Sequence, residues 1–362
     1  MTFEFSNKVK DLKPSAIREI FKSLTDPSVI SFAAGNPSPL SFPVEKLQKL
    51  ANEIFETESA KSLQYGITEG YAPLRKQVAE RLASKFGIGR DYDMTVITSG
   101  GQQGIDLACK VLCNEGDTVI CENPSFIGAL NAFRSYGVNL KGLDVGKDGI
   151  DPNELENILK TDKKVKLIYL IPTFQNPAGI TMSLEKRKRM LELAGKYNVL
   201  ILEDNPYGDL RFSGEDVPTI KSLDTEGRVI YAGSFSKILS PGMRLGYLAA
   251  DAKICEKIEI LKQVNDVHTP VLTQLMCVEF MKKYNIDSYI EKNRKLYGEK
   301  CAAMLEAMEK YFPKGKVEWT VPEGGIFLWC KCPTIEDITP VVNACLEKKV
   351  AIVPGSNFAV DM

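Results

Sequence analysis

One stretch decides the fold of this chain: Ser234-Phe235-Ser236-Lys237-Ile238-Leu239-Ser240-Pro241-Gly242-Met243-Arg244-Leu245-Gly246. The run Val229-Ile230-Tyr231-Ala232 before it predicts a strand, so we expect Lys237 just beyond a strand's carboxyl end, where open α/β sheets bind ligands. A lysine amine can hold a carbonyl as a Schiff base, while Ser234, Ser236 and Arg244 can bind a phosphate on the same ligand. The stretch therefore suits a phosphorylated aldehyde.

A second interpretation of the same residues is a serine acylase, because Ser234-x-x-Lys237 also fits the motif of β-lactamases and penicillin-binding proteins. That chemistry needs partner groups from Ser-Asp-Asn and Lys-Thr-Gly motifs, and neither tripeptide occurs in the chain. The acylase hypothesis therefore rests on a short match alone.

Composition indicates an ordinary globular protein. The chain has 362 residues, of which 44% are hydrophobic, enough for a full core and two domains. Its 46 basic and 47 acidic residues leave a net charge of -1, which argues against nucleic acid or an anionic membrane as the main partner. Nine cysteines scattered through apolar runs predict buried thiols, and His268, the only histidine, argues against a zinc site or a histidine triad and is read as structural.

Targeting signals are not evident in the sequence. The start Met1-Thr2-Phe3-Glu4-Phe5-Ser6 lacks the apolar core of a signal peptide, and no apolar run long enough to span a membrane follows. We therefore expect a cytoplasmic protein.

Strand and helix patterns alternate from about residue 70 to 250, which predicts an α/β fold with a mostly parallel sheet. Helical spacing is evident at 105–112 and 184–191. Beyond a charged helix that follows residue 285, the segments 317–322 and 326–329 predict a strand pair that opens a smaller domain. The expected strands of the sheet are 95–98, 118–121, 166–171, 199–203 and 229–232.

Each predicted strand ends in residues that could serve one ligand. Ser99-Gly100-Gly101-Gln102-Gln103-Gly104 opens a helix whose N–H groups could bind a phosphate, although a plain strand-to-helix turn would look the same. Phe126 could stack on a planar ring or pack in the core, and Asn176 offers a hydrogen-bond donor in a turn. Asp204 follows an apolar strand, where a carboxylate is costly to bury unless it is paired, as a protonated pyridine nitrogen would pair it.

Taken together, these motifs closely resemble the fold type I pyridoxal-phosphate (PLP) enzymes, specifically the class I/II aminotransferases. The chain looks most like the branch with 2-aminoadipate and kynurenine aminotransferases and the aminotransferase-like half of GntR-type regulators. The resemblance covers most of the chain and rests on residues 14–20, 30–37, 64–66, 99–104, 176–179, 204–207 and 234–246.

The resemblance implies a role for each site residue. Lys237 would form the Schiff base with PLP, Asp204 would keep the pyridine nitrogen protonated, and Asn176 and Tyr207 would bond the ring's phenolic oxygen. Phe126 would stack on the ring, and Arg18, Gly35 and Asn176 would contact the substrate. Tyr65 would reach the phosphate from a second subunit, so a homodimer with shared sites is expected. The other phosphate ligands would be Gly101, Gln102, Ser234, Ser236 and Arg244.

The resemblance also implies the domain plan. We expect a seven-stranded, mostly parallel central sheet in a large domain, 41–284, and a smaller α+β domain formed by both termini, 1–40 and 285–362. Relatives continue after Val353-Pro354-Gly355-Ser356 with an arginine that grips the substrate carboxylate, whereas the last arginine here is Arg294. The C-terminal domain therefore looks truncated, and intact cofactor binding with weak transamination is expected if it is.

The predicted function is the transfer of an amino group from an L-amino acid to a 2-oxo acid by a ping-pong mechanism, without a metal. The donor would be aminoadipate- or glutamate-like, aromatic or branched-chain. A β-lyase or decarboxylase would use the same cofactor groups. A non-catalytic effector-binding domain of a GntR-type regulator is the alternative from another class, but the N-terminal winged helix and linker of such regulators are not in this sequence.

Overall fold

A seven-stranded sheet forms the centre of the computed structural model, which describes residues 3–10, 26–33 and 35–360. The strand order is β2-β8-β7-β6-β5-β3-β4, and β8 alone runs antiparallel to its neighbours β2 and β7. All the other strands therefore end at the same edge, as the predicted α/β fold requires. The strands are β2 (Asp93–Thr98), β3 (Thr118–Asn123), β4 (Asn139–Asp144), β5 (Val165–Leu170), β6 (Leu200–Asp204), β7 (Val229–Ser234) and β8 (Gly246–Asp251).

Helices cover both faces of this sheet because side chains alternate along its strands. On β7, Ile230 and Ala232 pack with α6 (Gly101–Leu112), α7 (Ile127–Ser135) and α11 (Ala252–Asn265). Val229 packs on the opposite face with α8 (Pro152–Thr161), α9 (Leu184–Tyr197) and α10 (Ile220–Leu223). The result is a three-layer arrangement whose sheet is buried on both sides.

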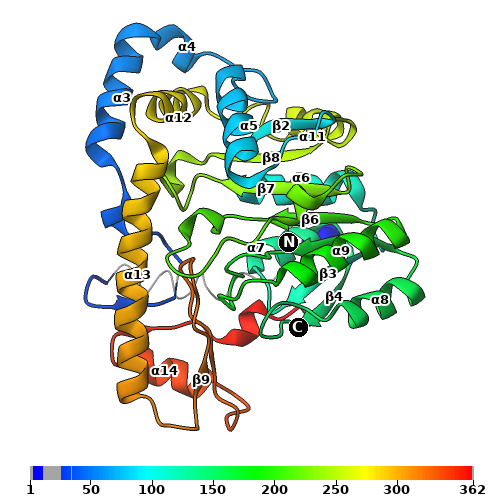
Figure 1. Ribbon diagram of the computed structural model, residues 1–362, viewed down its shortest axis with the longest axis vertical. Coiled ribbons are helices and arrows are strands. Elements are labelled where there is room, and N and C mark those ends of the chain that lie inside the picture. The colour runs from blue at the N-terminus through cyan, green and yellow to red at the C-terminus, as the bar shows by residue number, and fades with distance from the viewer. Residues whose placement is uncertain (1–2, 11–25, 34, 361–362) are drawn as a thin grey trace.

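A second group of helices packs at the β2 and β8 end of the sheet (Figure 1). It contains α3 (Val44–Thr57), α4 (Ser59–Leu63), α5 (Ala72–Phe86) and α12 (Val271–Lys283). The longest helix, α13 (Ile286–Tyr311), has 26 residues and so spans about 39 Å. It runs from this group to the C-terminal region with α14 (Thr339–Glu347) (Figure 1).

Segments from the two ends of the chain pair with each other. In the N-terminal part, α1 (Asn7–Lys10) precedes β1 (Ile30–Ser31), which pairs in parallel with β11 (Val350–Ala351). A second short pair joins β9 (Glu318–Trp319) to β10 (Cys330–Lys331). Short 3₁₀ turns lie at Pro39–Ser41, Gly208–Leu210, Pro241–Met243 and Gly355–Phe358.

Three of the strands that the sequence predicts for the sheet lie within β2, β3 and β7. The predicted strand 166–171 runs one residue past the end of β5 at Leu170, and 199–203 matches β6 from Leu200 onward. The predicted C-terminal strand pair is present, but its second strand begins later than 326–329: the partner of β9 is Cys330–Lys331, and Trp329 extends the pairing by accepting from the Thr320 amide at 2.9 Å. Phe327, at the start of the predicted span, instead contacts Tyr207 and Gly35. All nine cysteines are free, but the expectation of buried thiols holds fully for only four of them: Cys109, Cys121, Cys255 and Cys277. Cys330 is exposed and the other four are partly buried. None of the helices within the described parts of the chain is long and apolar enough to cross a bilayer.

Gly246 begins β8 at the point where three backbone segments meet. A Cβ atom there would lie 2.6 Å from the carbonyl carbon of Gly100 and 2.7 Å from the amide nitrogen of Gly101. We expect Gly246→Ala to lower the free energy of unfolding by about 1–3 kcal/mol, because backbone cannot yield as a side chain does. Denaturant unfolding would measure the loss. Gly242→Ala is the matched control, since its Cβ would meet only the Ser240 hydroxyl at 3.7 Å; an equal loss in both variants would contradict this explanation.

Candidate active site

Lys237 lies three residues beyond the end of β7, as the sequence predicts. Its Nζ atom donates a hydrogen bond to the carbonyl oxygen of Gly35 at 3.0 Å. Burial, and secondarily the positive charge of Arg244, lowers the pKa of Lys237 to about 8. A substantial fraction of this amine is therefore neutral near pH 7.5, and only the neutral amine attacks a carbonyl.

Arg244 lies over the N-terminus of α6. Its backbone is left-handed (φ 51°), and its Nη2 atom donates to the carbonyl oxygen of Ser99 at 3.1 Å. A Cβ atom on Gly100 would lie 2.3 Å from Nη2, so only glycine permits this approach. The first turn of α6, which begins at Gly101 and Gln102, adds backbone N–H groups and the positive end of the helix dipole. The guanidinium and the helix start together form a site for a phosphate.

The loop at the start of α6 is held by partly buried polar contacts. Ser99 Oγ donates to Asp266 Oδ2 at 2.7 Å, and Lys262 Nζ pairs with Asp266 Oδ1 at 2.7 Å. The other wall of the site comes from β7, where the Ser234 hydroxyl accepts from the amide of Ser236 at 3.1 Å. These contacts position the hydroxyl groups and helix N–H groups independently of any ligand.

Asp204 is the last residue of β6, and its side chain is buried. Burial raises the pKa of its carboxyl group to about 7, while a hydrogen bond from Tyr169 acts in the opposite direction. Among residues 3–10, 26–33 and 35–360, no cation forms an ion pair with Asp204. A protonated ring nitrogen would be a suitable partner for this carboxylate.

Asn176 and Tyr207 contact each other near the end of β6. Asn176 lies in the loop after β5, and Tyr207 lies in the turn after Asp204, the last residue of β6. Asn176 Nδ2 donates to the Tyr207 hydroxyl at 3.3 Å, whereas Asn176 Oδ1 is buried without a hydrogen-bond partner in the described structure. The turn after Tyr207 is anchored by Asp209, which pairs with Arg81 at 2.7 Å. A ring hydroxyl placed here could bond both side chains.

Phe126 and Gln102 pack closely where α7 begins. Gln102 Nε2 donates to the carbonyl oxygen of Gly128 at 2.8 Å, and a Cβ atom on Gly128 would come within 2.4 Å of both the Phe126 ring and Gln102 Oε1. Phe126 is partly buried against the core beneath it. Its ring is therefore fixed in position at this edge of the sheet, consistent with either of its two proposed roles.

The remaining predicted residues are Tyr65, Arg18 and Gly35. Tyr65 is 80% exposed, and its ring meets His268 edge-on at 5.7 Å. Arg18 lies outside the described residues. Gly35 is close to the site, because its carbonyl oxygen binds Lys237 and its Cβ position lies 2.6 Å from the ring of Phe327.

The structure adds two residues that sequence reasoning missed. Phe327 meets the Tyr207 ring edge-on at 5.6 Å, and Tyr169 donates from its hydroxyl to Asp204 Oδ2 at 2.8 Å. Tyr169 had a detectable signal, because its hydroxyl is carried by a mostly apolar strand that lies next to the strand ending in Asp204. Phe327 had none, because it lies far from the site residues in the sequence.

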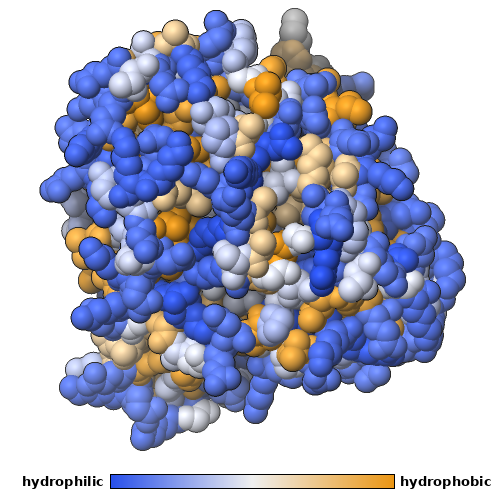
Figure 2. Space-filling model, turned by 45° about the horizontal axis from the view of Figure 1, so that its top comes forward, coloured by the Kyte–Doolittle hydropathy of each residue, from blue (hydrophilic) through white to orange (hydrophobic). Residues whose placement is uncertain are grey.

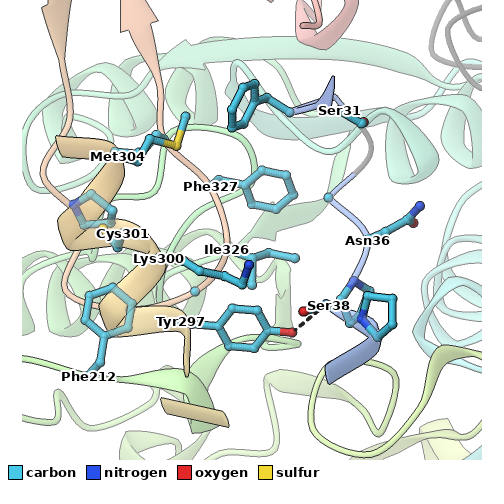
Figure 3. Close-up of a pocket in the computed structure, with 18 of the residues that line it drawn as sticks. Ser31, Asn36, Ser38, Phe212, Tyr297, Lys300, Cys301, Met304, Ile326 and Phe327 are labelled. Atoms are coloured by element: carbon cyan, nitrogen blue, oxygen red, sulfur yellow. Dashed lines mark hydrogen bonds between the residues drawn. The ribbon is translucent and has the colours of Figure 1, made fainter. Parts of the chain in front are cut away.

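A cavity of about 810 Å³ lies beside Gly35 and Phe327. Figure 3 shows Phe327 between α13, which carries Tyr297 and Lys300, and the N-terminal segment that carries Ser38. The Tyr297 hydroxyl accepts from the Ser38 amide at 3.1 Å and so links the two walls. The cavity therefore adjoins the segment around Gly35, whose carbonyl oxygen binds Lys237.

Comparison with known proteins identifies relatives along nearly the whole chain. The sequence profile of aminotransferase class I and II matches residues 27–361. Aromatic-amino-acid aminotransferase 1 of Thermococcus litoralis is 43% identical over 98% of this chain and 86% of its own.

Solved structures of aminotransferases are also similar to this chain. Kynurenine aminotransferase of Pyrococcus horikoshii, crystallised with PMP, superposes with a TM-score of 0.94 at 41% identity, covering 99% of this chain and 90% of its own. LysN, the α-aminoadipate aminotransferase of Thermus thermophilus, was crystallised with N-(5′-phosphopyridoxyl)-L-leucine. It superposes with a TM-score of 0.91 at 37% identity, covering 99% of this chain and 89% of its own.

The residues at the sheet edge fit such a cofactor. The buried, unpartnered Asn176 Oδ1, the Asp204 carboxyl without a cation in the described structure and the anion site at α6 match a pyridine ring with a phenolic oxygen and a phosphate. Lys237 supplies the amine for its aldehyde. The chain belongs to the class I and II aminotransferases and is a PLP-dependent transaminase.

Proposed function

We propose that this enzyme transfers the amino group of an aromatic, kynurenine-like or aminoadipate- and glutamate-like L-amino acid to a 2-oxo acid by a ping-pong mechanism. Branched-chain donors belong to the same proposal. The main supporting observation is a buried amine of lowered pKa, Lys237, close to a phosphate site and at the same sheet edge as Asp204. The substrate classes come from the names of relatives that act on aromatic amino acids, kynurenine and aminoadipate.

Each residue has a definite task in this proposal. When bound, PLP supplies an aldehyde for the Schiff base and a protonated ring that accepts the electrons of the broken Cα–H bond. Lys237 Nζ would take up the α-proton of the amino acid as a general base and give it back as a general acid. Asp204 would hold its negative charge toward the ring nitrogen, and Arg244 with the start of α6 would hold the phosphate. Asn176 and Tyr207 would bond the ring oxygen.

Other reactions share these groups. A β-lyase or a decarboxylase would use the same lysine and carboxylate, and the outcome would depend on which bond of the substrate lies perpendicular to the ring. The relatives named above are aminotransferases, which favours transamination. Transamination also differs from both alternatives in a measurable way, because without an acceptor it stops after one turnover.

We also propose a homodimer in which Tyr65 reaches the phosphate of the partner's site. The exposed tyrosine, and the exposed apolar residues Leu63 and Ile67 beside it, are compatible with burial against a second chain. Figure 2 shows apolar residues in several places on a largely polar face of the molecule.

A single-turnover experiment tests the proposed reaction. The PLP-loaded enzyme is mixed with a panel of L-amino acids without any 2-oxo acid, and the visible band, ammonia, carbon dioxide and 2-oxo acids are measured. A true donor bleaches the band and yields at most one equivalent of its 2-oxo acid per site. Lys237→Ala should yield none. Continuous release of ammonia or carbon dioxide would replace the proposal with a lyase or a decarboxylase.

The pKa of Lys237 predicts how loading depends on pH. The rate of Schiff-base formation with pyridoxal, which lacks a phosphate, should rise with pH with a midpoint at about pH 8, where half of the amine is neutral. Arg244→Gln removes a like charge, so it should raise the pKa of Lys237 and move the midpoint to higher pH. Stopped-flow absorbance measures both midpoints. An unchanged midpoint in Arg244→Gln would show that the arginine does not act on the amine.

Subunit complementation tests the role of Tyr65. Lys237→Ala and Tyr65→Ala are each expected to have low activity, but dissociating and re-associating a 1:1 mixture should restore about a quarter of the wild-type activity, because half of the dimers then carry one intact site. Lys237→Ala mixed with Asp204→Asn is the control. Both of these residues act within one chain, so that mixture should recover nothing. Failure of the first mixture to recover would place Tyr65 outside the partner's site.

A further inference from the structure

Tyr169 is a buried residue next to the site that the mechanism above does not use. It lies on β5, opposite Leu202 of β6, so it points to the same face of the sheet as Asp204, two residues further along β6. Its hydroxyl donates to Asp204 Oδ2 at 2.8 Å, and the Tyr169 side chain is 0% exposed. Within the described structure, this is the only hydrogen bond to the carboxyl group of Asp204.

The tyrosine is itself held firmly. Its ring meets Phe133 of α7 edge-on at 5.3 Å, and its backbone lies in a central strand between β3 and β6. Burial and the nearby carboxyl groups of Asp204 and Glu122 raise its pKa far above 10, so the phenol stays protonated and can only donate to a carboxylate. The hydroxyl is thus a fixed donor aimed at one oxygen of Asp204.

A fixed donor on Oδ2 has two consequences. It stops rotation of the carboxylate and leaves Oδ1 available to the ring nitrogen. It also stabilises the charged form of Asp204 against the burial that favours the neutral form. The other titratable groups near Asp204 are Tyr207, which is buried and neutral, and Glu122, whose pKa burial raises to about 7. Neither of them donates a hydrogen bond to Asp204 in the described structure.

We propose that Tyr169 is a positioning residue for Asp204, whose hydroxyl anchors Oδ2, directs Oδ1 to the ring nitrogen and keeps the proton of this pair on the nitrogen. The inference rests on the proposed role of Asp204. Without the donor, the carboxylate becomes the stronger base and takes the proton, so the ring loses its positive charge.

Tyr169→Phe tests the inference with a readout that does not depend on turnover. The variant is loaded with PLP labelled with ¹⁵N in the ring, and the ¹⁵N chemical shift is recorded beside the dissociation constant of PLP. We expect the resonance to move from the pyridinium position toward that of a neutral pyridine, with PLP bound about tenfold more weakly, as for loss of one charge-assisted hydrogen bond.

Tyr231→Phe is the matched control. Tyr231 is also fully buried, but its hydroxyl accepts from Asn205 Nδ2 at 2.9 Å and touches no carboxylate. The Tyr231→Phe variant should leave the ¹⁵N resonance and the affinity for PLP unchanged. If Tyr169→Phe does not fold, Phe133→Leu loosens the tyrosine ring while retaining the hydroxyl, and a smaller shift in the same direction is expected.

Three negative results have different meanings. A pyridinium resonance and PLP affinity in Tyr169→Phe that match the wild type would overturn the role of Tyr169. A wild-type resonance at the neutral position would instead refute the role of Asp204. Likewise, borohydride trapping of PLP on a lysine other than Lys237 would refute the proposed site.

Discussion

The close approach of β8 to the start of α6 is the constraint on which the site depends. β8 enters the sheet between β2 and β7 in the opposite direction, so the chain must turn back at the edge where the parallel strands end. At that turn Gly246 lies against the backbone of Gly100 and Gly101. The same turn carries Arg244 over the helix start, and Lys237 precedes it. A single packing contact thus sets the relative places of the phosphate site and the reactive amine.

Burial acts on both ionisable groups of the centre, and in opposite directions. It raises the pKa of Asp204 to about 7 and lowers that of Lys237 to about 8. Both groups are therefore driven toward their neutral forms in the absence of a partner, which limits the cost of burying them. A cationic ring beside Asp204 would favour the charged carboxylate. A phosphate beside Arg244 would balance the charge of the guanidinium. The cofactor therefore completes an electrostatic balance that the protein leaves open, and its binding should stabilise the fold.

The sequence predicts the apolar strands of the sheet better than its polar or small-residue strands. Strands such as β5 and β7 are apolar runs because both their faces are buried, and they were recognisable for that reason. β4 was not, because Asn139-Leu140-Lys141-Gly142-Leu143-Asp144 is a polar edge strand. β8 was missed because its residues are small and follow directly from the turn.

For the site, the residues predicted at the sheet edge lie there because each follows the end of a strand in the sequence. Tyr169 was missed although its hydroxyl stood out in a mostly apolar strand, because the sequence does not show which group of a neighbouring strand that hydroxyl contacts. Phe327 reaches the centre from the C-terminal region, a long-range contact that spacing cannot reveal. The roles of Tyr65 and Arg18 depend on a second chain and on a segment outside the described residues, so they stay predictions.

The hydrogen bond between Lys237 and the carbonyl oxygen of Gly35 has a consequence for cofactor affinity. A Schiff base uses the same nitrogen, so the free amine must release this carbonyl before it can react. The bond therefore competes with cofactor loading and lowers the apparent affinity for PLP by its own free energy, about 1 kcal/mol for a bond of this type. In the loaded enzyme this hydrogen bond would no longer tie the N-terminal segment at Gly35 to Lys237. The apo and loaded enzymes should thus differ in the protection of this segment, even if the sheet beneath is identical.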